Sequence, residues 1–158
     1  MAAEFQRRRV AVMVKSKVDS LLENSKQNAK IIIAGDFNCS PDDQVMSLLI
    51  SDGDTADYLV NLSEIATNDG KGTYRYRGIW EMIDQVIVSD GLLTNREGLY
   101  TDEKMFSIFK PDFLLGRDPK YPGMTPLSTY RGYRYQGGYS DHLPVLLDLR
   151  FRYQDQQE

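Results

Sequence analysis

Three short segments carry the side chains that could do chemistry in this sequence. Asp36 and Asn38 directly follow an apolar run, and alternate residues beyond the end of a sheet strand can face one cavity. Asp141 and His142 stand before the last apolar run, where an adjacent carboxylate and imidazole can supply a metal ligand and a proton acceptor. Because His142 is the only histidine, any chemistry that needs a proton acceptor near neutral pH depends on it.

The same segments also have purely structural interpretations. Gly, Asp and Asn form loops readily, so local chemistry alone favours a turn at Asp36 and Asn38. Asp84 interrupts an apolar strand, where a carboxylate is costly unless it is paired or bound to a metal. A solvated strand edge is an equal alternative for this residue. The Asp–His pair fits a cap or a turn, and the glycines before it, Gly137 and Gly138, indicate either a close backbone approach or a turn.

The composition is that of an ordinary folded domain. A chain of 158 residues with 41% hydrophobic residues predicts a single domain, residues 1–158. The net charge of −4 argues against a nucleic-acid-binding module, although arginines cluster at 7–9, at 75 and 77, and at 131 and 134. One cysteine excludes an intrachain disulfide and a cysteine-rich zinc site. No apolar run has the length of a membrane span, and localisation stays open.

The elements that must position these residues predict an α/β (α+β) domain. Residues 5–25 are predicted to form an amphipathic helix. The apolar face of this helix is predicted to consist of Val10, Val14, Val18, Leu21 and Leu22. Residues 30–34 predict a buried strand, and Ser40 is suited to cap a helix that ends near Leu49. A second short helix is predicted at 56–64.

The second half of the chain reads as strands joined by loops. Strands are predicted at 72–78, at 82–89, within 97–108 and at 143–151. A loop rich in Gly, Pro and Tyr covers about residues 110–139, and loops of that length are usually functional or disordered. Tyr and Arg alternate at 74–77, which favours Tyr inward and Arg outward across a half-buried sheet. A similar stretch at 130–135 lies in the loop beside Asp141, so we expect Tyr130 and Arg131 to contact a substrate.

Three blocks, standing in order, resemble the signatures of the endonuclease/exonuclease/phosphatase superfamily. IIIAGDFNCSPDD resembles the GDFN block, GTYRYRGIWEMIDQVIVS the ID-x-[I/V] block and GGYSDHLPVLLDL the SDH-[L/Y]-P block. The resemblance spans roughly residues 10–150. It implies half of a four-layer α/β/β/α sandwich, with one mixed, mostly antiparallel sheet flanked by helices. It also implies a hydrolase of phosphoester bonds, of the nuclease or phosphodiesterase/phosphatase type, in which water attacks the phosphate.

The resemblance implies a role for each of five residues. Asp36 would bind the metal or orient the attacking water, and Asn38 would donate a hydrogen bond to the scissile phosphate. Asp84 would accept a hydrogen bond from His142 and fix its tautomer, while His142 would contact the phosphate and assist proton transfer. Asp141 would support the metal. Oxygen ligands without further His or Cys favour Mg²⁺ (or Mn²⁺) over zinc.

One part of the family pattern is not identifiable in this sequence. The family's N-terminal half supplies an Asn, a Glu that binds the metal and a second His, and none of the three is recognisable here. We therefore expect a C-terminal half, a truncated form whose exposed apolar sheet face pairs with a second copy as a homodimer. The alternative is a catalytically inactive half-domain that acts through self-association or partner binding. The substrate, a nucleic acid or a small phosphodiester, is chosen by loops rather than by these motifs.

Overall fold

The computed structural model describes residues 2–25, 29–50, 59–68, 70–94 and 98–153, and it confirms the α+β class. The helices are α1 (Ala2–Asn24), α2 (Gln44–Leu49), α3 (Glu64–Asn68) and α4 (Asp90–Leu93), with 3₁₀ helices at Glu103–Met105 and Asp112–Leu114. The strands are β1 (Ile32–Asp36), β2 (Leu59–Asn61), β3 (Tyr74–Tyr76), β4 (Ile79–Glu81), β5 (Asp84–Ser89), β6 (Gly98–Tyr100), β7 (Phe106–Ile108), β8 (Leu115–Arg117), β9 (Met124–Pro126), β10 (Tyr130–Arg131), β11 (Arg134–Tyr135), β12 (Val145–Leu147) and β13 (Arg150–Arg152). In the described part of the chain, no helix is long and apolar enough to cross a membrane.

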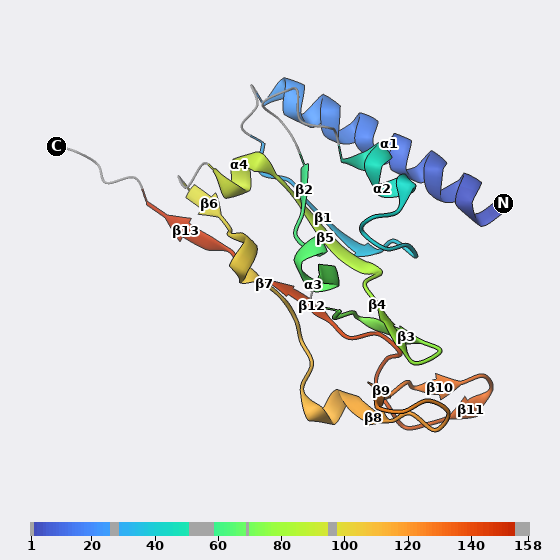
Figure 1. The fold of residues 1–158 in the computed structure, drawn as a ribbon. Coiled ribbons are helices and arrows are strands. Elements are labelled where there is room, and N and C mark those ends of the chain that lie inside the picture. Colours follow the sequence, from blue (N-terminus) through green and yellow to red (C-terminus); the bar gives the residue numbers. More distant parts are fainter. Residues whose placement is uncertain (1, 26–28, 51–58, 69, 95–97, 154–158) are drawn as a thin grey trace.

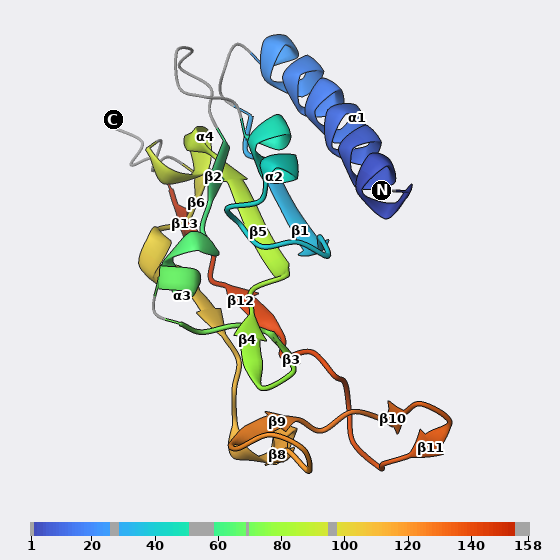
Figure 2. The ribbon, with the colours of Figure 1, turned by 45° about the vertical axis from the view of Figure 1, so that its right-hand side comes forward.

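The central sheet has the order β1-β5-β2, and both of its pairings are antiparallel. In Figures 1 and 2, α1 and α2 lie on one face of this sheet. Ile33 of β1 and Ile87 of β5 are direct neighbours and belong to the core under these helices. The helix residues buried in this core are Ala11, Val18 and Leu22 of α1 and Val45, Met46 and Leu49 of α2.

The opposite face of the sheet is covered in part by the last strands of the chain. Val86 of β5 belongs to a second core, which includes Phe106 of β7 and both Val145 and Leu147 of β12. We expected this face to be bare, but β7 and β12, which pair with each other, form a second layer over it. The open part is β1, an edge strand, where Ile32 is 40% exposed. β1 is therefore not the buried strand that its apolar run predicts.

Two predictions about the N-terminal helices are wrong in detail. α1 forms, but Val10 is 56% exposed and Leu21 is 43% exposed, because only a narrow stripe of the helix meets the rest of the protein. Ser40 does not cap α2. The cap is Asp43, whose carboxylate accepts a hydrogen bond from the Val45 N–H at 2.8 Å. This local bond starts the helix three residues later than the Ser-Pro pair suggests.

The C-terminal elements also differ from the prediction. Of the helix predicted at 56–64, residues 56–58 lie outside the described residues, and 59–61 form β2 because they pair with β5. The predicted strand within 97–108 is two strands, β6 and β7, separated by a 3₁₀ helix, and the last strand divides into β12 and β13. The predicted loop at 110–139 contains two hairpins, β8–β9 and β10–β11, which extend away from the sheet in Figures 1 and 2.

A buried ion pair holds the β8–β9 hairpin against β3–β4. The Arg75 side chain is 6% exposed, and its guanidinium lies 3.1 Å from the Asp118 carboxylate. It also donates to the carbonyl oxygens of Gly78 at 3.1 Å and Pro122 at 2.5 Å. Tyr76, in contrast, is 47% exposed. The predicted alternation of Tyr inward and Arg outward is therefore wrong, because a distant carboxylate gives Arg75 a partner inside the protein.

Candidate active site

The end of β1 and the start of β5 bring two predicted site carboxylates together. The strand register makes Asp36 and Asp84 direct neighbours, and directly opposite residues of an antiparallel pair point to the same side of a sheet. By the two-residue period, that side carries Ala34 and Val86 and is the side that β12 covers. Like charges directly opposite each other repel. The pair therefore favours a cation or a proton donor next to it.

His142 provides such a donor. Its Nδ1 lies 2.7 Å from Asp84 Oδ2, and the two side chains are only 23% and 17% exposed. When Nδ1–H donates to the carboxylate, the imidazole is held in one tautomer and Nε2 points away from Asp84. Asp84 is thus a paired carboxylate rather than a solvated strand edge.

β3 joins the Asp84 segment to the His142 segment. Tyr74 and His142 form an isolated backbone bridge, and the Leu143 N–H donates to the Thr73 carbonyl oxygen at 2.8 Å. The buried Thr73 hydroxyl accepts a hydrogen bond from the Asp84 N–H at 3.3 Å. Because Thr73 contacts both segments, the distance between the carboxylate and the imidazole is set by the backbone as well as by their own contact.

The turn that carries Asp36 and Asn38 is held in one conformation. Asp36 Oδ1 accepts a hydrogen bond from the Asn38 N–H at 2.8 Å. Asn38 has a φ of 52°, a left-handed conformation that Asn tolerates better than most residues. The Phe37 N–H donates to the Ile83 carbonyl oxygen at 2.8 Å, which fixes the turn to the residue before Asp84. The local interpretation as a turn is correct, and the turn also lies beside the Asp–His pair.

A buried amide network supports this turn, and none of the sequence motifs points to it. Gln85 is fully buried, and its amide donates to the Cys39 carbonyl oxygen at 2.6 Å. The Gln85 side-chain oxygen accepts from the Asn61 amide at 2.6 Å, and Asn61 in turn accepts from the Ser63 N–H at 3.0 Å. The available signal was a second polar residue inside an apolar strand, directly after Asp84.

Gly138 allows two backbone segments to meet just before the Asp–His pair. A Cβ at this position would lie 2.1 Å from the Leu127 carbonyl oxygen. The same oxygen accepts hydrogen bonds from the Tyr139 N–H at 2.7 Å and the Ser140 N–H at 3.2 Å. The close approach that the glycine pair suggested is therefore to the chain's own backbone, and it fixes the residues that lead into Asp141.

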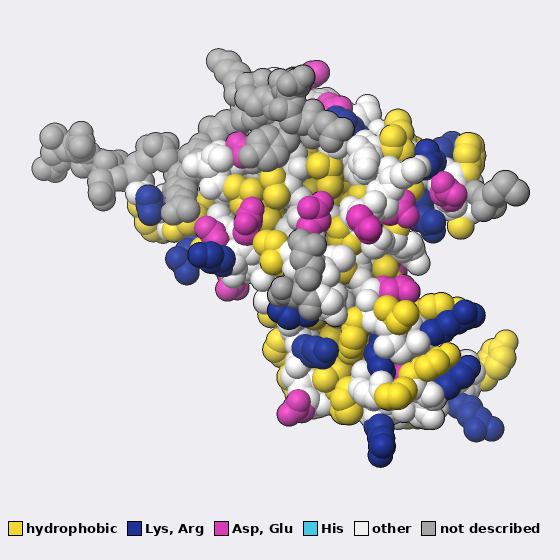
Figure 3. Space-filling view, in the orientation of Figure 1, with side chains coloured by type: hydrophobic (Ala, Val, Ile, Leu, Met, Phe, Trp, Pro, Cys, Tyr) yellow, Lys and Arg dark blue, Asp and Glu magenta, His cyan; other side chains and the backbone are white. Residues whose placement is uncertain are grey.

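Tyr130 and Arg131 lie on the β10–β11 hairpin. Tyr130 is opposite Tyr135, and Arg131 is opposite Arg134, so one face of the hairpin carries two Tyr and the other carries two Arg. Tyr130 is 60% exposed and meets Tyr135 with a distance of 5.5 Å between ring centroids. Figure 3 shows Lys and Arg side chains gathered over the lower part of the molecule, where β8–β11 lie. The hairpin thus offers an accessible aromatic face and an accessible cationic face.

The exposed carboxylates of Asp36 and Asp141 are the groups to consider as ligands of a divalent cation. In the part of the chain that the structure describes, no group of three or more His, Cys, Asp and Glu side chains is arranged to hold a metal ion. Mg²⁺, however, is usually held by one or two carboxylates, with waters and substrate phosphates as its other ligands. Asp36 and Asp141 are both exposed and supply oxygen ligands of this kind. Their oxygen atoms are of the chemical kind that Mg²⁺ binds.

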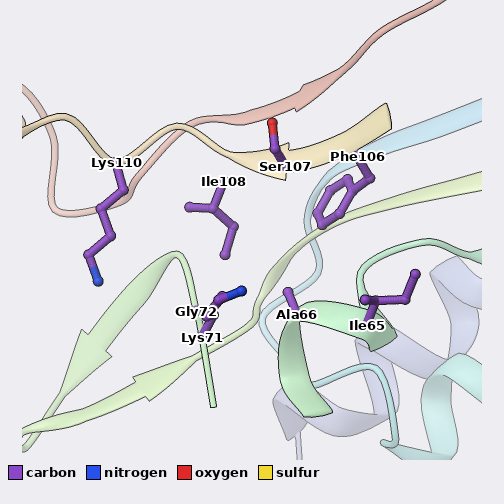
Figure 4. Close-up of a pocket in the computed structure, with 8 residues that line it drawn as sticks. All are labelled: Ile65, Ala66, Lys71, Gly72, Phe106, Ser107, Ile108 and Lys110. Atoms are coloured by element: carbon purple, nitrogen blue, oxygen red, sulfur yellow. The ribbon is translucent and has the colours of Figure 1, made fainter. Parts of the chain in front are cut away.

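A separate cavity of about 340 Å³ lies between α3, β7 and the residues before β3. Figure 4 shows that Phe106 and Ile108 face it from β7 and Ile65 from α3. Lys110 lines its other end, and partial burial, together with the nearby Arg75 guanidinium, lowers the pKa of Lys110. The lining residues include none of the seven predicted site residues. This cavity is therefore distinct from the candidate active site.

Comparison with known proteins identifies a family for nearly the whole chain. The sequence model of the Endonuclease/Exonuclease/phosphatase family matches residues 2–151. Comparisons with curated proteins and with solved structures each found no match. The matched range contains the Asp36–Asn38 turn, Asp84 and the Asp141–His142 pair. The chain therefore belongs to the Endonuclease/Exonuclease/phosphatase family, whose members in general hydrolyse phosphoester bonds.

Proposed function

We propose that this chain is a Mg²⁺-dependent (or Mn²⁺-dependent) hydrolase of phosphoester bonds, in which a water molecule attacks the phosphate. The observation that supports this proposal most is the 2.7 Å contact between Asp84 and His142, with Asp36 as the direct neighbour of Asp84. A carboxylate that orients an imidazole, beside a second carboxylate, is a set of groups able to engage a phosphate and to move a proton.

In the proposed reaction, Asp84 keeps Nδ1 of His142 protonated and Nε2 faces the substrate. When the ring carries both protons, Nε2–H donates to an oxygen of the phosphate and later transfers its proton to the leaving oxygen. The nearby carboxylate stabilises the charged ring that this step requires. Both side chains are largely buried, so this interaction is screened less by solvent than a surface pair would be.

The turn after β1 supplies the remaining groups. We assign the Asn38 amide as a hydrogen-bond donor to the scissile phosphate, and Asp36 as the group that orients the attacking water. The hydrogen bond from the Asn38 N–H to Asp36 supports this assignment, because it fixes the two residues relative to each other. A preorganised donor loses less free energy to ordering when the charge develops in the transition state.

Asp36 and Asp141 are the proposed metal ligands, and a bound Mg²⁺ would neutralise charge on the phosphate. Isothermal titration of the chain with MgCl₂ tests this assignment directly. We expect Asp36→Ala and Asp141→Ala to weaken Mg²⁺ binding at least about tenfold. Asp148→Ala, which removes an exposed carboxylate between β12 and β13, is the matched control and should bind like the unaltered chain. Equal binding by all variants would refute the metal site.

The β10–β11 hairpin is the proposed contact with a phosphodiester substrate, either a nucleic acid or a small phosphodiester. Arg131 suits bidentate binding to a phosphate, and the exposed ring of Tyr130 suits stacking against a base. We expect Arg131→Ala to raise KM for an oligonucleotide more than for bis-p-nitrophenyl phosphate, because the longer substrate offers further phosphates to the hairpin. Equal changes in KM for the two substrates would argue against this contact.

Hydrolysis of bis-p-nitrophenyl phosphate in the presence of MgCl₂ tests the activity itself. We expect His142→Ala and Asp141→Ala to lower kcat by about 100-fold or more, and the Asp148→Ala control to leave it unchanged. The reaction should stop when EDTA is added. Full activity in the His142→Ala variant would mean that the hydrolysis does not come from this site.

A second candidate function is self-association without catalysis, which is the role of an inactive half-domain. The observation in its favour is the open side of β1, where Ile32 is 40% exposed and the strand has β5 as its one described neighbour. A second copy of the chain that packs on this side would bury it and form a homodimer. Sedimentation velocity over a range of concentrations should then show a dimer that Ile32→Lys converts to monomer. A monomer at every concentration would refute this candidate.

A further inference from the structure

The imidazole of His142 has a second neighbour that none of the proposed roles uses. The ring of Tyr74 lies 4.8 Å from it, centroid to centroid, with 35° between the two planes. The two residues are also joined by the isolated backbone bridge between β3 and the segment before β12. Tyr74 is half-buried, so much of its ring is in contact with the protein rather than with water.

One hydrogen bond does not fix an imidazole completely. The contact between Nδ1 and Asp84 sets one edge of the ring, but the ring can still rotate about the line that joins the two atoms. Such a rotation moves Nε2, the nitrogen on the far edge. The Tyr74 ring, tilted by 35° relative to the imidazole at 4.8 Å between centroids, limits this rotation on its side without competing for either nitrogen.

Tyr74 is itself held in place, which a positioning group requires. It is paired across the hairpin with Glu81, and its ring stacks on Tyr76 at 6.5 Å with 15° between the planes. Burial, and then the nearby Asp141 and Glu81 carboxylates, raise the pKa of the Tyr74 phenol. The ring therefore stays uncharged at neutral pH and acts through its face.

We propose that Tyr74 is a positioning residue for His142, and that its ring holds the imidazole plane so that Nε2 points at the substrate phosphate. The part of this inference that concerns substrate rests on the proposed function. The part that concerns the orientation of the ring depends only on the contact between Tyr74 and His142. Because the face of the ring carries the effect, Phe should replace Tyr74, whereas Ala or Leu should not.

The single histidine makes a direct test possible. In long-range ¹H–¹⁵N spectra of the uniformly labelled chain, every imidazole signal comes from one residue. At alkaline pH, we expect the unaltered chain and Tyr74→Phe to populate the tautomer with Nδ1 protonated. Both should also have upfield-shifted imidazole C–H protons, because the imidazole lies 4.8 Å from an aromatic ring, centroid to centroid. Tyr74→Ala and Tyr74→Leu should lose the upfield shift, while the contact between Nδ1 and Asp84 keeps the same tautomer.

Tyr153→Ala is the matched control, since it removes an exposed aromatic ring of the last described residue, which has no part in holding Tyr74. Its imidazole signals should stay close to those of the unaltered chain. Backbone ¹H–¹⁵N spectra identify any variant that fails to fold, and the Leu variant keeps apolar bulk if the Ala variant does fail. Unaltered imidazole signals in a folded Tyr74→Leu or Tyr74→Ala chain would overturn the proposal.

Kinetics provide a second readout that separates this inference from the proposed function. With bis-p-nitrophenyl phosphate we expect Tyr74→Ala to lower kcat about three- to tenfold, the range set by a typical aromatic contact, with KM within about twofold. Tyr74→Phe should restore kcat. An inactive unaltered chain would refute the proposed function, and the NMR result would still decide whether Tyr74 orients the ring. A loss of activity confined to KM would overturn the positioning role.

Discussion

Replacing Gln85 by Met tests whether the amide network behind the active site holds the turn after β1. Gln85 is fully buried and donates to the Cys39 carbonyl oxygen at 2.6 Å, while its own oxygen accepts from Asn61 at 2.6 Å. Met has a similar length but neither a donor nor a strong acceptor. The change therefore leaves one buried acceptor, at Cys39, and one buried donor, at Asn61, without a partner.

The expected loss of stability follows from these two groups. Each unsatisfied buried polar group costs about 1–3 kcal/mol, so the sum is about 2–6 kcal/mol. The more apolar Met side chain offsets part of this cost, and we expect the free energy of unfolding to fall by about 3 kcal/mol. Unfolding in urea, followed by the fluorescence of the single tryptophan, Trp80, measures the change.

The control for this prediction is Gln6→Met, the same substitution at an exposed position of α1. It should change the free energy of unfolding by less than about 0.5 kcal/mol. If Gln85→Met is equally harmless, the network is not a determinant of stability, and the argument that it anchors the turn fails. If Gln85→Met is destabilising and the remaining folded protein keeps its activity, Gln85 supports the fold without controlling the geometry of Asp36 and Asn38.

Three further predictions concern single residues. Hydrogen bonds from two backbone N–H groups, and then the Arg75 guanidinium, hold the pKa of Asp118 below its ordinary value of 3.8. The ionised form of Asp118 therefore stabilises the fold above that pH. The urea midpoint of the unaltered chain should decline below about pH 4, and that of Asp118→Asn should decline less steeply. Gly138→Ala should displace the segment before Asp141, because the new Cβ would lie 2.1 Å from a carbonyl oxygen, and both the melting temperature and kcat should fall. Asp84→Asn should lower kcat by about 100-fold or more with little change in melting temperature. The amide keeps the shape of the side chain but no longer fixes the tautomer of His142. Wild-type turnover in this variant would contradict the proposed role of Asp84.

One contact of the candidate site, between Asp84 and His142, was predicted from the family resemblance, and the structure contains it. GDFN follows one strand and IDQV begins another, and an antiparallel pairing of these two strands suffices to bring Asp36 opposite Asp84. The SDH segment precedes a strand in the layer that covers β5, which brings His142 to the same end. The motifs do not indicate which residues hold these segments in place. Thr73, Tyr74 and Gln85 lie outside the motif letters, and their partners are at least ten residues away in the chain.

Local sequence patterns predicted the wrong cap or element where two alternatives have nearly the same local free energy. Ser40 and Asp43 are both good caps. In the structure Asp43 caps the helix, because its carboxylate accepts from the Val45 N–H once contacts with the β5 segment have fixed the turn after β1. Residues 59–61 have no strong local preference, and they form a strand because one edge of β5 is available to them. In both cases the deciding contact is with a segment that a short sequence window does not contain.

The Tyr-Arg-Tyr-Arg stretch illustrates the same limit most clearly. Alternation with a period of two predicts a strand with two distinct faces, but it is symmetric and does not say which face is buried. Hydrophobicity favours Tyr inside, and burying an unpaired guanidinium would cost several kcal/mol. The structure reverses this preference at Arg75 because Asp118, 43 residues later, and two carbonyl oxygens satisfy the guanidinium. With Arg75 directed to the β8–β9 hairpin, Tyr74 is left to contact His142. The ion pair that secures the hairpin and the aromatic contact in the active site are therefore consequences of one choice of strand face.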